Sequence, residues 1–125
     1  MTNGTLEGKH KRLIEEMNAV EVRKIINEKT VAILVFVSCE NHGDHMPFWS
    51  YFIFPAEIAK RVATNISNVI VLPAIPYGVS LHHDKFQMTM SINPETMIGI
   101  ISDLLSSLNQ NQISRVLIIN GHDGN

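Results

Sequence analysis

The chain has 125 residues, of which 45% are hydrophobic and 18% are charged, and its formal net charge is −2. This length and composition are typical of one globular domain, and the small negative charge argues against nucleic acid or membrane partners. Cys39 is the sole cysteine, so no internal disulfide can form, and no apolar stretch approaches the ~20 residues of a membrane span. The first residues lack the apolar core of a signal peptide, so we expect a cytoplasmic protein.

The chain begins with a polar segment that we expect to be a flexible tail over residues 1–12, followed by one domain over residues 13–125. Asn18, with Glu21 three positions later, predicts a capping box at the start of a helix that ends near residue 29. Residues 31–37 are continuously apolar and predict a strand that is buried on both faces.

Polar residues follow this strand at once, in the stretch 38–47. Glu40 and His42 are two positions apart and can point to the same side of an extended segment. A carboxylate and an imidazole are the usual ligands of zinc, manganese or non-haem iron. An isolated pair of this kind is also compatible with a strand end that simply faces water.

The next segment is unusually aromatic between Phe48 and Phe54. Its aromatic residues predict hydrophobic contacts of a helix start or subunit interface rather than a wall for a stacked substrate. Ser50 can begin a helix that ends near Asn65, although Pro55 is tolerated only in a first turn, so the helix is expected to begin or bend there. Residues 69–73 predict a second short buried strand.

A second polar cluster, at residues 80–84, contains His82 and His83. In an extended segment adjacent side chains point to opposite faces, so at most one of the two histidines is expected to face a site. Asn93 followed by a proline predicts a helix with a clean apolar face. Residues 115–119 then predict a third buried strand, which ends in the polar stretch 120–125.

Helices and strands thus alternate along the whole chain, which predicts an α/β fold with three αβα layers around a mostly parallel sheet. In such a sheet the loops after the strands gather at one edge, where ligands bind. We therefore expect the histidine-containing loops to form one site.

Three motifs make the chain similar to the creatininase (creatinine amidohydrolase) family. The first is Glu-x-His-Gly-x-His-x-Pro at residues 40–47, and the second is Tyr-Gly-x-Ser-x-x-His at 77–83. The third is Asn-Gly-His-x-x-Asn at 120–125, and all three occur in the family's order. This resemblance implies a creatininase-like fold over the N-terminal half of the family's length.

The resemblance also implies a divalent-metal centre, zinc or manganese with one or two ions per chain, that hydrolyses a C–N bond of a small linear or cyclic amide. Glu40, His42 and His122 would be metal ligands. Proton transfer to the leaving nitrogen would fall to a nearby histidine or acid, for which His83 and Asp123 are the candidates.

Several positions depart from the family pattern. The family places a bridging Asp eleven positions after the motif Glu, where this chain has Tyr51, and a neutral phenol is a poor bridge between two cations. His82 stands where the family commonly has Glu, and Asp123 replaces a Gly. Asp44 and Asp123 are additional carboxylates that can either rebuild the bridge or face solvent.

Family members are about twice as long as this chain, and two interpretations of this difference remain open. One is an amidohydrolase that acts as a homo-oligomer, hexameric as in the family, or with a second chain that carries the C-terminal half. The other is a non-catalytic subunit that keeps the fold. A phosphate-binding turn at residues 121–124 is a weaker third interpretation, because the glycine spacing is wrong.

Overall fold

The computed structural model describes residues 11–125, so most of the tail expected over 1–12 lies outside the described residues. Arg12 nevertheless belongs to the folded part, since its side chain is buried and its carbonyl oxygen accepts a hydrogen bond from the Val71 amide. A short 3-10 helix, η1 (Ile14–Glu16), follows. The folded domain therefore includes the end of the expected tail.

Three parallel strands form the sheet: β1 (Val31–Phe36), β2 (Val69–Val71) and β3 (Arg115–Asn120). Their order is β2-β1-β3, so β1 is central and pairs with β3 along its whole length. Five of the six β1 residues are buried, as expected for a strand with a neighbour on each side and a helix on each face. The predicted parallel α/β fold is confirmed.

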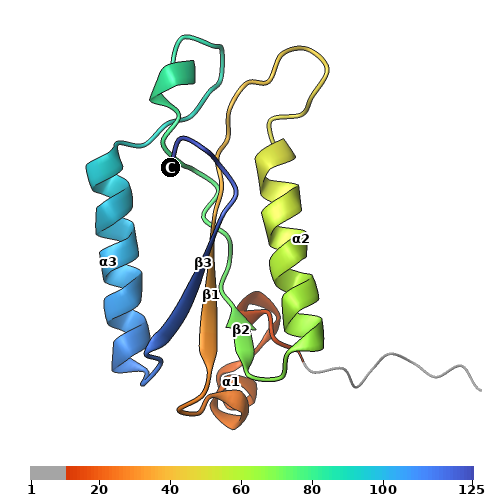
Figure 1. The fold of residues 1–125 in the computed structure, drawn as a ribbon, viewed down its shortest axis with the longest axis vertical. Helices are drawn as coiled ribbons and strands as arrows, with labels where there is room; N and C mark the ends of the chain where they lie inside the picture. Colours follow the sequence, from red (N-terminus) through yellow and green to blue (C-terminus); the bar gives the residue numbers. More distant parts are fainter. Residues whose placement is uncertain (1–10) are drawn as a thin grey trace, which may run out of the picture.

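The helices α2 (Ser50–Asn65) and α3 (Pro94–Gln110) lie on opposite sides of the sheet and complete three layers (Figure 1). Two hydrophobic cores result, because alternate strand residues point to opposite faces. Ile33 and Val35 pack with Ala59 on the α2 side, and Leu34 and Phe36 pack with residues of α3 on the other.

The helix starts follow the sequence signals with one exception. The helix α1 (Ala19–Ile25) begins with the predicted capping box, in which the Asn18 side chain accepts from the amides of Val20 and Glu21. The Asn93 side chain makes no capping bond at the start of α3, although Pro94 occupies the first helical position as predicted.

The expectation that the helix begins at Pro55 is wrong, because α2 begins at Ser50 and continues through this residue. Proline has no N–H to donate to the carbonyl four positions earlier, which is that of Tyr51. The Pro55 ring and this carbonyl both lie against Gly121, where any Cβ would be 2.1 Å from Cγ of Pro55. The lack of a side chain at Gly121 therefore leaves room for the Pro55 ring where α2 approaches the loop that follows β3.

The chain moves outward from β1 to β2 through α2, then returns across β1 to β3 through α3. This reversal makes the gap between the carboxyl ends of β1 and β3 a topological switch point, where open α/β sheets bind ligands. Among the described residues, β3 has no neighbour on its second side.

No helix within residues 11–125 has the length and apolar character needed to cross a membrane.

Candidate functional site

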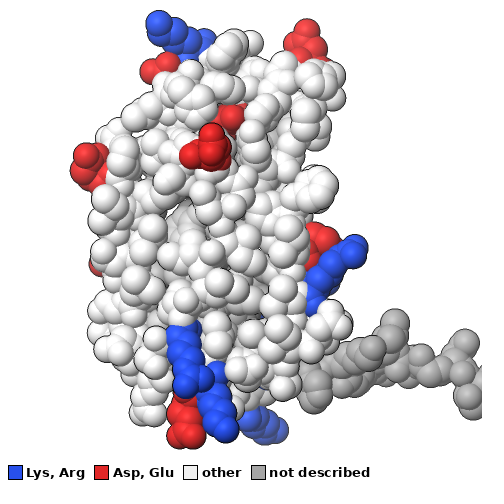
Figure 2. All heavy atoms as spheres, in the orientation of Figure 1, with Lys and Arg blue, Asp and Glu red and all other residues white. Residues whose placement is uncertain are grey.

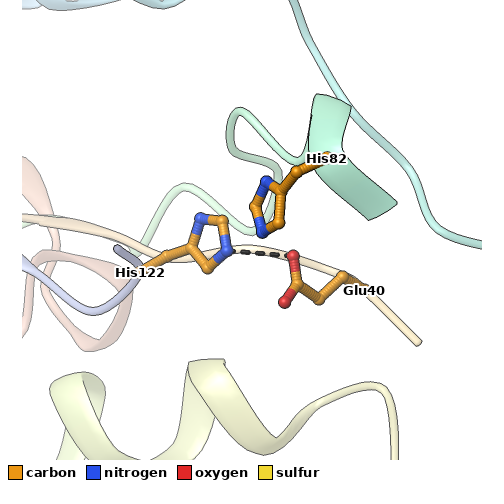
Figure 3. A group of neighbouring side chains, drawn as sticks. All are labelled: Glu40, His82 and His122. Atoms are coloured by element: carbon orange, nitrogen blue, oxygen red, sulfur yellow. Dashed lines mark hydrogen bonds and ion pairs between the residues drawn. The ribbon is translucent and has the colours of Figure 1, made fainter. Parts of the chain in front are cut away.

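Three loops meet at the switch point, and each brings side chains that can bind a metal. Glu40 follows β1, and His122 follows β3. A short 3-10 helix, η2 (Leu81–His83), lies between β2 and α3 and carries two histidines. Figure 3 shows Glu40, His82 and His122 pointing toward one another from these three segments.

Glu40 is the centre of the site, and its side chain is almost completely buried. Its Oε2 lies 2.9 Å from Nε2 of His122, and its Oε1 lies 3.2 Å from Nε2 of His42 and 3.5 Å from Nδ1 of His83. One buried carboxylate thus faces three imidazoles. Buried charges in proteins are paired or coordinate metals, so this arrangement is typical of a functional centre.

The loop that carries Glu40 is fixed by the segment before α3. The Met90 amide donates to the carbonyl oxygen of Cys39, and the Asn41 amide donates to the Thr89 hydroxyl at 3.0 Å. Gly43 then adopts φ +80°, a conformation that glycine accepts at little cost, and its amide donates to Oδ1 of Asn41. These contacts turn the chain so that Glu40 and His42 face the same point.

Asn125 orients the ring of His122. Oδ1 of Asn125 accepts a hydrogen bond from the Val79 amide at 2.9 Å, which identifies this atom as oxygen rather than nitrogen. It also lies 3.3 Å from Nδ1 of His122, so Nδ1–H is the donor there. Nε2 lies 2.9 Å from Oε2 of Glu40, where it donates a hydrogen bond as Nε2–H or, once that proton is lost, offers a lone pair to a metal ion shared with the carboxylate.

Two further nitrogen atoms in the site have no hydrogen-bond partner, namely Nε2 of His42 and Nδ1 of His83. Both are buried, and both lie near Oε1 of Glu40 without the geometry of a hydrogen bond. Unpartnered buried polar atoms are rare in folded proteins and call for an explanation such as a bound ion, substrate or water.

The electrostatics of the site favour one negative charge. Burial raises the pKa of Glu40, but the Ser80 hydroxyl and the imidazoles of His122, His83 and His42 together lower it further, so the pKa lies below its usual value. Burial, with smaller effects of Glu40 and Asp123, raises the pKa of Tyr51. Near neutral pH, Glu40 is therefore ionised and Tyr51 is a neutral phenol.

Tyr51 lies directly over the site, with its ring 4.6 Å from that of His42 and 5.1 Å from that of His122, between centroids. A cleft of about 820 Å³ opens beside it. The walls are mainly apolar residues of α2 and β3, and the polar lining includes His42, Tyr51, His122 and Asp123. Such a mixture of apolar walls and few polar groups is typical of a site for a small molecule.

The structure brings most of the predicted site residues together. Glu40, His42, His83 and His122 form one cluster, whereas Asp123 is exposed at the edge of the cleft. Asp44 is also exposed, and it belongs to no potential metal group among residues 11–125.

The expectation that only one of the two adjacent histidines faces the site is wrong. They lie in a 3-10 helix rather than a strand, so side chains do not alternate between faces. His83 approaches Glu40, and the His82 ring stacks on that of His122 at a centroid distance of 5.9 Å.

Sequence reasoning missed three residues that shape the site: His82, Ser80 and Asn125. The described residues contain one group of three potential ligands whose atoms lie within 4.8 Å of one another, and it consists of Glu40, His82 and His122. All three missed residues lie within the second and third motifs. Their place beside motif histidines, on loops that meet at one sheet edge, was the available signal.

The fold and this cluster define an α/β protein with a glutamate and histidine centre at a sheet switch point. The family model Creatininase, described as creatinine amidohydrolase, matches residues 15–125. The chain belongs to the creatininase family.

Relatives in this family include enzymes with different names. The chain is 29% identical to the creatinine amidohydrolase of Pseudomonas putida over 97 residues, which cover 74% of this chain and 37% of that protein. It is 24% identical to the mycofactocin precursor peptide peptidase of Mycobacterium tuberculosis (strain ATCC 25618 / H37Rv), over 93% of this chain and 50% of that protein. The chain thus spans at most about half the length of these curated relatives.

Solved structures agree with this relationship. A creatininase variant complexed with creatine superposes with a TM-score of 0.85 at 26% identity, over 91% of this chain and 46% of that one. A Zn–Zn form of a creatininase variant gives a TM-score of 0.82 at 27% identity, over 88% of this chain and 45% of that one.

Proposed function

We propose that this chain supplies the metal-binding half of an amidohydrolase that cleaves a C–N bond in a small linear or cyclic amide. The observation that supports this function most directly is the buried Glu40 carboxylate, which faces three imidazoles at 2.9–3.5 Å beside an apolar cleft. Family membership supports the same reaction class.

The residues present fit a divalent ion. Glu40 is ionised, Nδ1 of His122 donates to Oδ1 of Asn125 and so leaves Nε2 on the side of the carboxylate, and unpartnered imidazole nitrogens lie close by. Glu40 and His122 would hold the ion together with a further histidine, which is His42 by resemblance or His82 by position. Bound there, a zinc or manganese ion would act as a Lewis acid on the amide carbonyl and lower the pKa of water to about 7.

The remaining groups suit binding and proton transfer. His83 carries a buried, unpartnered Nδ1 that can move a proton toward the leaving nitrogen. Asp123, at the rim of the cleft, is the second candidate for this role. The Tyr51 hydroxyl can hydrogen-bond a polar group of the substrate, and the apolar walls exclude water from the reacting bond.

The complete enzyme requires more than this chain in our proposal. These relatives are about twice as long, and β3 has an open side within the described residues. We propose that a homo-oligomer, or a second polypeptide that corresponds to the C-terminal half of the relatives, covers this side. The alternative is a non-catalytic subunit, which is favoured by the neutral Tyr51 at the position of the family's bridging Asp.

The test is amide hydrolysis by the purified chain, alone and with any polypeptide that co-purifies, on creatinine, other cyclic amides and short peptides. We expect zinc- or manganese-dependent turnover that Glu40→Gln abolishes. His45→Ala is the matched control, because His45 belongs to the same motif but is exposed outside the cluster. Metal binding without turnover on any substrate would favour the non-catalytic subunit.

A further inference from the structure

His82 occupies a position that neither the three motifs nor its own exposure marks as a ligand. Its side chain approaches the buried pair of Glu40 and His122 from the solvent side, and a nitrogen of its ring lies within 4.8 Å of ligand atoms of both (Figure 3). Its ring is inclined only 14° to that of His122, so the two imidazole planes are stacked and nearly parallel.

The other histidines do not form an equally compact group. His42 and His83 both face Oε1 of Glu40, while His122 faces Oε2. The rings of His42 and His83 are 6.1 Å apart between centroids, and neither residue belongs to the group with ligand atoms within 4.8 Å. Two ligands of one zinc ion, each about 2.1 Å from the metal, are at most about 4.2 Å apart. Among the side chains of the cluster, those of Glu40, His82 and His122 therefore need the smallest movement to bind one ion together.

The charge of the cluster limits the number of ions. Glu40 is the only carboxylate in the group, and the side chain at position 51 is a phenol, which is neutral at pH 7. Two divalent ions in this space would repel each other strongly, with a single negative charge to offset four positive ones. One ion leaves a local charge of about +1, as in other sites with two histidines and one glutamate.

We propose that His82 is the third protein ligand of a single divalent ion that Glu40 and His122 also hold. This inference rests on the proposed function and specifies its metal centre. Two imidazoles and one carboxylate form a ligand set of catalytic zinc sites, which leaves a fourth position open for water or substrate. His42 and His83, on the other oxygen of Glu40, remain free for proton transfer and substrate contacts.

The ligand set also implies a metal preference. Imidazole suits zinc, whereas manganese favours carboxylate, carbonyl and water ligands. The resemblance places Glu commonly at the position of His82, so this chain has an imidazole where a carboxylate is usual. The site should therefore select zinc over manganese more strongly than a site richer in carboxylates.

The experiment measures metal binding by the 125-residue chain rather than turnover. Zinc, manganese and cobalt are titrated into metal-free protein, with bound metal measured by elemental analysis and Co²⁺ coordination followed by visible absorption. We expect the protein to bind one equivalent of zinc and to bind manganese more weakly than zinc. The visible absorption of bound Co²⁺ should indicate a low coordination number. His82→Ala should weaken zinc binding by more than the roughly 10–100-fold typical of outer-shell changes, and His45→Ala should leave it unchanged.

His82 is exposed and belongs to neither hydrophobic core, so the variant should fold, which circular dichroism checks. His42→Ala separates the two possible third ligands. Zinc binding that is lost in His42→Ala but kept in His82→Ala would overturn the inference and leave the proposed amidohydrolase intact. Two equivalents of zinc would overturn the single ion, while failure of the unaltered chain to bind any metal would contradict the proposed function itself.

Discussion

Gly124 shows how tightly single residues are packed beneath the histidines. A Cβ atom at this position would lie 2.4 Å from the Val79 carbonyl oxygen and 2.7 Å from Cε1 of His122. Gly124→Ala must therefore displace the Val79 backbone, the His122 ring or both, and we expect weaker metal binding together with a loss of roughly 1–3 kcal/mol in unfolding free energy. Isothermal titration with zinc and chemical denaturation measure the two effects.

Gly99→Ala is the matched control for this change. Gly99 is exposed in α3, and a Cβ there would have no atom within 4 Å. Alanine should stabilise the helix by about 0.5–1 kcal/mol without any effect on metal binding. Equal zinc affinities for Gly124→Ala and Gly99→Ala would contradict the placement of His122 as a ligand.

Tyr51 tests whether a second anion allows a second ion. The resemblance to the family implies a bridging Asp at this position, and the Tyr51 ring lies within 5.1 Å of those of His42 and His122, between centroids. Tyr51→Asp adds a carboxylate there, and we expect zinc stoichiometry to rise from one toward two equivalents per chain. Tyr77→Asp, at an exposed position, should leave the stoichiometry at one. Two equivalents already in the unaltered protein would show that the bridge has been rebuilt.

For single residues, the sequence predicted which residues belong to the site better than it predicted which residues they contact. Glu40, His42 and His122 could be predicted because each follows a strand within a recognisable motif. The sequence could not show whether His82 or His83 is the better candidate for a metal ligand. The directions of both side chains depend on a 3-10 helix that no local pattern predicted. The role of Asn125 likewise depends on the Val79 amide, which is distant in the sequence.

Among the elements, α1 offers the simplest test of a local signal. The Asn18 side chain accepts from two amides at 3.0 Å, and the Asn18 amide donates to the Glu21 side chain at 2.9 Å. Asn18→Ala should lower the unfolding free energy by about 1 kcal/mol, because helix-end amides lose their acceptor. Urea denaturation measures the change, and Asn18→Ser, which can still cap, should restore most of it.

The same capping box predicts a dependence of stability on pH. The hydrogen bond from the Asn18 amide is the main cause that lowers the pKa of Glu21 below its usual value of 4.5. A depressed carboxyl pKa contributes stability that is present above about pH 4.5 and is lost as pH falls through the lower, folded-state value. Glu21→Gln should remove this part of the acid sensitivity, as urea denaturation at pH 6 and pH 3.5 can show. An unchanged difference between these pH values would contradict it.

The bounds of helices and strands could be predicted where they depend on local sequence patterns, but not where they depend on packing between distant residues. The positions of the three strands could be predicted because they are short apolar runs between polar loops. The expected burial of the third strand is wrong, because β3 has no neighbour on its second side among the described residues and four of its six residues are exposed. The course of α2 through Pro55 could not, since it depends on the contact of this proline with Gly121, across the fold.

For the molecule as a whole, strand order decides what remains exposed. The alternation of helices and strands predicted a parallel sheet, but it did not predict which strand is central. Local sequence patterns do not show on which side of β1 each later strand is placed. In the order β2-β1-β3, the strand β3 carries exposed Leu117 and Ile118, and exposed Phe54 of α2 lines the nearby cleft. Figure 2 shows that charged side chains are sparse over the middle of the face where β3 lies.

An apolar edge strand of this kind pairs with another polypeptide or aggregates. We therefore expect the isolated chain to associate at micromolar concentration, which sedimentation velocity can measure. Leu117 pairs with Ile33 and Ile118 with Leu34, so the two exposed side chains point to opposite faces of the sheet. Ile118→Lys places a charge on this edge without altering either buried core, and it should shift the chain toward monomer.

Ser106→Lys is the control with the same change in charge, because Ser106 is exposed on α3 and does not lie on the open edge. It should associate like the unaltered chain if β3 is the contact. A folded monomer for the unaltered chain at micromolar concentration would refute the expectation, since an unpaired apolar strand would then be stable in water. Equal association of both lysine variants would place the contact elsewhere. A polypeptide that restores a single species with the unaltered chain but fails with Ile118→Lys would identify β3 as the edge where the two halves meet.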